Sequence, residues 1–150
     1  MKRLIIFLLL ATCSASAFAQ FPLGGKEKDI RAYFNKNVAY ASAKNFKTDN
    51  GTNGVRFLKP HGIGDYTFYF DSNGYCTSYV VTYGNRELDN VVDRLNATFR
   101  PVNSATWTSD SQDTNVTVVP PRDTDNYFSV VYLRSAGNIE ISSPITLASN

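Results

Sequence analysis

The sequence is poor in the residues that most enzyme active sites need. It has one histidine, one tryptophan, one methionine and two cysteines among 150 residues. It contains no Cys-x-x-Cys pair, no glycine-rich phosphate loop and no set of residues that makes a Ser-His-Asp triad. No sequence motif therefore identifies a reaction, and a function has to be inferred from the architecture.

Long hydrophobic runs are also scarce. The only one, at residues 4–11, follows a basic start at residues 1–3 and precedes a small-x-small site at residues 17–19. This order predicts a secretory signal peptide at residues 1–19. The run is too short to anchor the chain in a bilayer, and no second run of about 20 apolar residues follows. We expect an exported chain, periplasmic or extracellular, without a transmembrane segment after cleavage.

The two cysteines lie far apart in the sequence. Residues 10–13 loosely resemble a lipobox that would make Cys13 a lipidated N-terminus, although Thr12 fits that pattern poorly. Cleavage after Ala19 would instead remove Cys13 and leave Cys76 alone. A single cysteine cannot form an internal disulfide, so packing must stabilise the domain. The sequence leaves open whether Cys13 is lipidated.

The excess of positive charge lies in the leader. Removing Lys2 and Arg3 from the 15 basic residues leaves as many as the 13 acidic ones. A neutral domain lacks the basic surface that phosphate backbones require. We expect neither nucleic-acid binding nor a cofactor.

A β-hairpin at residues 66–83 is the clearest element. Two runs of β-branched and aromatic residues meet at residues 71–74, where Asp71 opens a turn and Gly74 ends it. A type I turn with a glycine bulge pairs Phe70 with Cys76, whereas a two-residue turn moves Cys76 to the other face. We favour the bulged turn because it places the thiol among phenylalanines, where free cysteine usually lies.

The favoured register assigns each side chain of the hairpin to a face, because side chains alternate with period 2. One face carries apolar and small residues: Phe68, Phe70, Cys76, Ser78 and Val80. The other carries mainly amphipathic residues: Tyr69, Tyr75, Thr77, Tyr79, Val81 and Tyr83.

Apolar spacing predicts the remaining elements. A helix is expected at residues 26–37, and a second begins at Asn85, whose side chain is expected to accept hydrogen bonds from the first turn. Its apolar stripe is Leu88, Val91, Val92, Leu95 and Phe99. Further strands are expected at residues 38–46, 55–59, 102–108, 116–119 and 127–133, and a short one at residues 139–141 in a Ser-rich tail at residues 136–150.

The chain also aligns with itself. An offset of 61 residues superimposes Ile30 on Val91, Phe34 on Leu95, Asp49 on Asp110, Val55 on Val116, Pro60 on Pro121 and Tyr66 on Tyr127. We interpret this as a duplicated α-β-β-β unit with halves at residues 26–70 and 86–133, joined by a strand at residues 75–83. The predicted fold is α+β: one domain at residues 20–135, in two layers, with an antiparallel sheet and both helices on one face.

With this repeat and the Phe-Asp-Ser-Asn-Gly hairpin, the chain resembles the PepSY-like and β-lactamase-inhibitor-protein-like modules of exported bacterial proteins. The resemblance covers most of the mature chain and lies in the pattern of elements. It implies a non-catalytic module that binds or inhibits other proteins, and it transfers no specific residue.

Few residues are candidates for chemistry. His61 is a candidate base or metal ligand, and Cys76 is a nucleophile only if a base reaches it. Residues 49–54 resemble the start of a calcium loop, but Pro60 stands where the bidentate Glu belongs, so we read a turn. Two acidic loops are candidates for a cation site: they carry Asp110, Asp113, Asp123 and Asp125.

These observations favour an exported, non-enzymatic protein-binding or inhibitor-like module. The expected contact surface is the open sheet face with its four tyrosines: Tyr69, Tyr75, Tyr79 and Tyr83. The expected partner is a protein of the cell envelope or a second copy of the chain. Two alternatives stay open: a small hydrolase or metal-dependent enzyme that uses His61 and the loop acids, and an accessory structural subunit of an envelope assembly.

Overall fold

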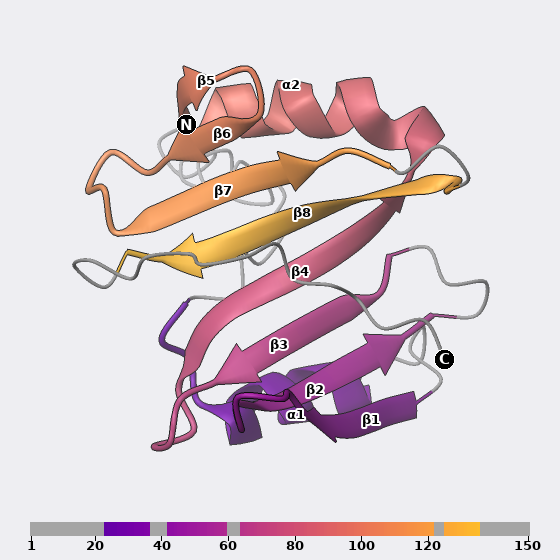
Figure 1. Ribbon diagram of the computed structural model, residues 1–150, viewed down its shortest axis with the longest axis vertical. Helices are drawn as coiled ribbons and strands as arrows, with labels where there is room; N and C mark the ends of the chain where they lie inside the picture. The colour runs from indigo at the N-terminus through magenta and orange to yellow at the C-terminus, as the bar shows by residue number, and fades with distance from the viewer. Residues whose placement is uncertain (1–22, 37–41, 60–63, 122–124, 136–150) are drawn as a thin grey trace, which may run out of the picture.

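A computed structural model describes residues 23–36, 42–59, 64–121 and 125–135 (Figure 1). The predicted signal peptide at residues 1–19 and the tail at residues 136–150, with its expected strand at 139–141, lie outside these residues.

A single antiparallel sheet of eight strands forms the centre of the fold. Together with two α-helices it gives an α+β fold, as the sequence predicts. The strands follow one another across the sheet in the order β1-β2-β3-β4-β8-β7-β6-β5. Their bounds are β1 Ser42–Lys47, β2 Asn53–Leu58, β3 Tyr66–Phe70, β4 Cys76–Gly84, β5 Arg100–Asn103, β6 Thr106–Thr108, β7 Thr114–Val119 and β8 Tyr127–Arg134.

Each helix buries two apolar residues at the spacing seen in the sequence, whereas Leu88 of the predicted second stripe is 36% exposed. Helix α1 (Glu27–Lys36) buries Ile30 and Phe34, and helix α2 (Leu88–Thr98) buries Val91 and Leu95. These are positions i and i+4 of each helix, which lie one turn apart on the same side.

The start of the second helix differs from the prediction. Strand β4 continues to Gly84, and a 3-10 turn, η2 (Asn85–Glu87), precedes α2. The Asn85 side chain makes no capping hydrogen bond and instead donates through Nδ2 to the carbonyl oxygen of Asp125, 3.1 Å away. Asn85 therefore ties the end of β4 to the start of β8.

The strand predicted at residues 102–108 is two strands, β5 and β6, that form a hairpin. The side-chain oxygen of Asn103 accepts a hydrogen bond from the amide of Ala105, 2.9 Å away. This local bond is typical of an Asn that starts a turn, and it breaks the run of extended residues.

Two clusters of buried side chains make up the core. The first joins α1 to β2, β3 and β4: Ile30, Phe34, Val55, Phe57, Phe68, Phe70, Cys76, Tyr79 and Val81. The second joins α2 to β6, β7 and β8: Val91, Leu95, Phe99, Trp107, Val116, Val118, Phe128 and Val130. Tyr83 and Tyr132 are partly buried and pack against both clusters.

Strands β4 and β8 join the two halves of the sheet. Seven consecutive residue pairs connect them, from Ser78 with Leu133 to Gly84 with Tyr127. Within this ladder the paired Tyr79 and Tyr132 rings stack with centroids 4.4 Å apart and an interplanar angle of 9°. Apolar contact between the two clusters is thus concentrated along this pair of strands.

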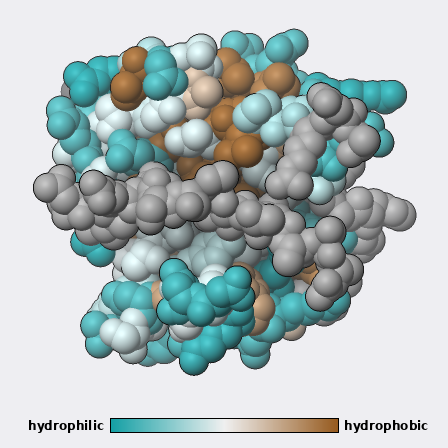
Figure 2. Space-filling model, in the orientation of Figure 1, coloured by the Kyte–Doolittle hydropathy of each residue, from teal (hydrophilic) through white to brown (hydrophobic). Residues whose placement is uncertain are grey.

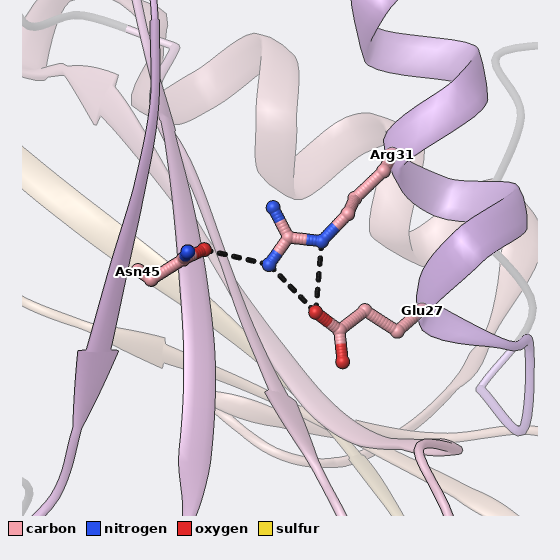
Figure 3. A network of polar contacts seen from close by, with 3 residues as sticks. All are labelled: Glu27, Arg31 and Asn45. Carbon is pink, nitrogen blue, oxygen red and sulfur yellow. Dashed lines mark hydrogen bonds and ion pairs between the residues drawn. The ribbon is translucent and has the colours of Figure 1, made fainter.

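A small polar network connects α1 to the edge strand β1 (Figure 3). Arg31 donates through Nε to Glu27 Oε1 at 2.8 Å and through Nη2 to Asn45 Oδ1 at 2.6 Å. Both charged side chains are about one-third exposed, so water screens the ion pair and its contribution to stability is small. The network nevertheless joins α1 to β1 through Asn45.

The core clusters lead to a stability prediction. Phe34→Ala and Leu95→Ala should each lower the free energy of unfolding by roughly 2–5 kcal/mol, because each empties a buried site. Leu88→Ala is the matched control, since Leu88 is 36% exposed on α2 and should lose less than about 1 kcal/mol. Urea denaturation measures all three, and losses as small as the control at both core sites would contradict the described packing.

Candidate functional site

The turn of the central hairpin is the bulged turn favoured from the sequence. The amide of Gly74 donates to the carbonyl of Asp71, and Gly74 has a φ of +76°, a conformation that favours glycine. The Asp71 carboxylate accepts hydrogen bonds from the amides of Asn73 and Tyr75, both at 2.9 Å. Phe70 pairs with Cys76, as predicted.

A β-bulge in β4 directly after this turn changes which residues share a face of the sheet. Phe70 pairs with Cys76, but Tyr69 pairs with Ser78, so Thr77 is an extra residue in β4. Such a bulge reverses the alternation of side chains beyond it. The prediction that Ser78 and Val80 share the face of Cys76 is therefore wrong.

The segment that leads into α1 explains why the ladder is interrupted there. Backbone groups of Cys76 exchange hydrogen bonds with Gly24 and Gly25, at 2.7 and 2.9 Å. Lys26 forms an isolated bridge with Tyr75. The start of β4 is thus occupied by the segment that leads into α1, and β8 pairs with β4 only from Ser78 onward.

The four predicted site tyrosines do not share an open face. Tyr79 is 3% exposed in the first core cluster, and Tyr83 packs against both clusters and stacks on Phe128. Tyr69 is buried on the other side of the sheet, because it pairs with Ser78. Tyr75 lies at the hairpin turn, 37% exposed, with the Lys26 ammonium 5.6 Å from its ring centre.

The face that carries Tyr69 is the side of the sheet away from both core clusters, and we call it the opposite face. Directly paired residues point to the same side, so its members follow from the register. Its central residues are short: Thr67, Ser78, Val80, Thr82, Ser129 and Val131. Around them lie Phe46, Gly54, Arg56, Asn115, Thr117, Val119, Tyr127 and Leu133.

An aromatic corner lies at one side of this face. The Phe46 ring sits directly over Gly54, where any Cβ would collide with it, and it meets the Tyr69 ring edge-on with centroids 5.6 Å apart. Glycine is required here because its missing side chain makes room for the ring. The corner fixes Tyr69 in place and helps to bury it.

An exposed apolar patch lies on the other half of the opposite face. Val119 is 44% exposed and Tyr127 is 42% exposed, and Val131 and Leu133, further along the same face of β8, are partly buried. Figure 2 shows hydrophobic residues gathered on this face over β7 and β8. Sequence reasoning missed this patch, although Tyr127, Val131 and Leu133 alternate with the core residues of the same predicted strand.

The candidate nucleophile is buried. Cys76 has no exposed surface, and burial raises the pKa of its thiol to about 12, against a smaller opposing effect of the hydrogen bond to Ser78. A thiol that stays protonated at neutral pH is a poor nucleophile. The candidate base His61 lies outside the described residues, so the hypothesis that the two meet stays a prediction.

The loop acids that the structure describes do not gather. Asp113 is exposed, and hydrogen bonds from Ser111 and Ser109 lower its pKa. Asp110 is also exposed, and Asp123 lies outside the described residues. Within the described part of the chain, no group of three or more His, Cys, Asp and Glu residues is placed to hold a metal ion.

A shallow hollow lies between the start of α1 and the hairpin turn. Its lining includes Lys26, Lys28, Arg31 and Tyr75. Two of these cations already have partners: Lys26 lies over the Tyr75 ring, and Arg31 binds Glu27 and Asn45. The opposite face is therefore the stronger candidate for a contact surface.

Comparisons with protein-family models, curated proteins and solved structures found no significant match for this chain. Among the residues that the structure describes, no helix has the length and apolar character needed to cross a membrane.

The thiol of Cys76 and the phenols of the partly buried Tyr66 and Tyr132 predict how stability depends on pH. The pKa of the Cys76 thiol rises from 9.0 to about 12 in the fold, and those of Tyr66 and Tyr132 from 10.0 to about 12, in each case mainly through burial. Above pH 9 the unfolded chain releases the thiol proton while the folded chain keeps it. The free energy of unfolding therefore keeps its full value below about pH 9. It falls as pH rises toward 12, by about 1.4 kcal/mol per pH unit for each such proton.

Cys76→Ala separates the thiol from the phenols. In this variant the decline should begin about one pH unit later, when the unfolded tyrosines start to ionise. Urea titrations at pH 7 to 11 measure the onset. An unchanged onset in the variant would show that the thiol does not stay protonated in the fold.

Proposed function

We propose that this chain is an exported, non-enzymatic module that binds a protein partner through the opposite face of its sheet. The observation that carries the proposal is the apolar patch of Val119, Tyr127, Val131 and Leu133, which lies on the side of the sheet away from both core clusters. Exposed apolar side chains that gather on one face are typical of interaction surfaces.

The composition of the face fits a protein better than a small molecule. Short hydroxyl and aliphatic side chains line this face along β4 and β8, and Tyr127 adds an aromatic ring with a polar tip. Tyrosine is enriched at protein interfaces because it gives much contact area for little lost rotamer entropy. The resemblance to inhibitor-like exported modules supports the same kind of partner.

We further propose a two-layer architecture that leaves this face to the partner. Tyr83 and Tyr132 pack against the clusters of both helices, which supports a position of α1 and α2 on one side of the sheet. A sheet with helices on one side uses its other side for solvent or for a second protein.

The order of elements favours a duplicated unit of one helix and four strands. Helix α1 precedes β1 to β4 and α2 precedes β5 to β8, and the last strands of the two sets, β4 and β8, pair antiparallel at the centre. Half a turn about an axis perpendicular to the sheet exchanges the two sets and keeps both helices on one side.

This unit of one helix and four strands differs from the α-β-β-β unit that the sequence predicts at an offset of 61 residues. That frame aligns β2 with β7, but it also maps β3 onto β8, and both of these strands run antiparallel to β4. A rigid repeat of that kind would exchange the faces of the sheet and require the helices on opposite sides. We therefore favour the unit with four strands.

Photo-crosslinking tests the proposed surface. A photoreactive residue at Val119, on the opposite face, should capture an envelope protein, and the same residue at Leu88, on α2, serves as the matched control. Both positions are similarly exposed, 44% and 36%, so accessibility alone predicts equal capture. Tyr127→Ser should reduce capture from position 119 at least tenfold while the melting temperature stays within about 3 °C.

Equal capture from both positions, or capture from Leu88 alone, would contradict the proposed surface. If Tyr127→Ser fails to fold, Tyr127→Thr takes its place, because it also removes the ring. Retained capture in a folded variant that lacks the ring would also contradict the proposed surface.

A further inference from the structure

The two outermost strands of the sheet differ in how well they suit a further strand. Among the described residues, β1 and β5 each have a neighbouring strand on one side only (Figure 1). Strand β5 has four residues, its register with β6 shifts between Pro101 and Asn103, and proline lacks the N–H that an added strand would bind. Strand β1 has six residues, contains no proline and keeps an unbroken register with β2. The edge of β1 is therefore the better template.

The backbone groups on the outer side of β1 belong to alternate residues. In the turn that joins β1 to β2 the amide of Thr48 donates to the carbonyl of Thr52, so these two residues form a hydrogen-bonded pair. Hydrogen-bonded and non-hydrogen-bonded pairs alternate along an antiparallel ladder. The even-numbered residues of β1 are therefore bonded to β2, whereas the N–H and C=O groups of Ala43, Asn45 and Lys47 point away from it. All three residues are exposed, so a strand can reach these groups.

The charged side chains at this edge are mainly cations. Every charged residue of β1 and β2 is positive: Lys44, Lys47 and Arg56. The turn between the strands adds Asp49, so three positive charges and one negative charge give the hairpin a net charge of +2. Lys44 and Arg56 are paired on the opposite face, and Lys47 lies on the other side of the sheet. An added strand would thus meet a cation on each of its two faces.

A second copy of the chain does not match this edge. Pairing of β1 with itself would bring lysines together, and the other outer strand, β5, carries Arg100 and Pro101. Like charges on adjacent strands repel, and lysines on an exposed edge are a common means of preventing such self-pairing. The same lysines favour a strand that carries carboxylates.

We propose that the outer edge of β1 binds an extended acidic segment of another protein by β-strand addition. Ala43, Asn45 and Lys47 exchange backbone hydrogen bonds with the added strand, and the lysine side chains at positions 44 and 47 bind carboxylates on its two faces. This edge site is separate from the patch on the opposite face, and it does not depend on a partner there.

A synthetic peptide of alternating valine and glutamate, blocked at both ends and about as long as β1, is the probe. Fluorescence anisotropy measures its affinity for residues 20–150. We expect binding that is about tenfold weaker in the double variant Lys44→Glu and Lys47→Glu. The matched control is Arg86→Glu and Arg100→Glu, which changes the net charge equally at exposed positions away from β1 and should keep the affinity.

Hydrogen exchange distinguishes strand addition from a general attraction between charges. With the peptide bound, the amides of Asn45 and Lys47 should exchange about tenfold more slowly, whereas that of Phe46, already bonded to β2, should keep its rate. Ala43→Pro removes an outward N–H and leaves the β1–β2 ladder intact, so it should weaken binding about fivefold while the melting temperature stays within about 3 °C. If this variant fails to fold, the exchange rates decide.

Several outcomes would overturn the proposal. One is the absence of binding by the valine and glutamate peptide, and another is equal binding of a peptide with proline in place of valine, which keeps the carboxylates but cannot join a sheet. Unchanged affinity in the lysine variant, or unchanged exchange at Asn45 and Lys47 with the peptide bound, would also contradict it. Protection of these amides that grows with protein concentration alone would indicate a second copy instead. None of these results depends on crosslinking from Val119.

Discussion

The pairing of β4 with β8 is the interaction on which the rest of the structure depends. Seven residue pairs connect two sets of strands that are otherwise separate, and the Tyr79–Tyr132 stack lies within this ladder at the boundary between the two core clusters. The two rings are in near-parallel contact, a geometry that stabilises the pair in addition to the effect of the area they bury. The Arg94 guanidinium, 5.8 Å from the centre of the Tyr83 ring, adds a contact from α2 to the same seam.

Much of the fold could be predicted from local patterns. The buried pairs Ile30–Phe34 and Val91–Leu95 follow from helical spacing, and the turn at Asp71 and Gly74 from the conformational demands of that turn. The extra residue Thr77 could not be predicted in this way. Its cause is tertiary, because backbone groups of Cys76 are engaged by Gly24 and Gly25, about 50 residues away in the sequence.

The extra residue Thr77 determines which side chains share a face of the sheet, and so which of them can belong to a contact surface. A tyrosine fits both a wet surface and a core in which its hydroxyl finds a partner, so the residue type at Tyr79 or Tyr83 does not reveal its side of the sheet. Reversing the alternation moved both into the core and brought Val80 to the other side. The patch at Val119 and Tyr127 depends on the pairing of β7 with β8, which follows from the topology of the whole sheet.

The central position of β8 also shapes the order in which the molecule can form. Ser78 of β4 pairs with Leu133 of β8 across more than 50 intervening residues, so this edge of β4 stays without its partner until β8 is available. The hairpin of β3 and β4, by contrast, has close partners in sequence and is suited to early formation. While it lacks its partner, an unpaired strand of this kind favours aggregation. Pairing of β8 with β4 is therefore the step that removes this exposed strand edge.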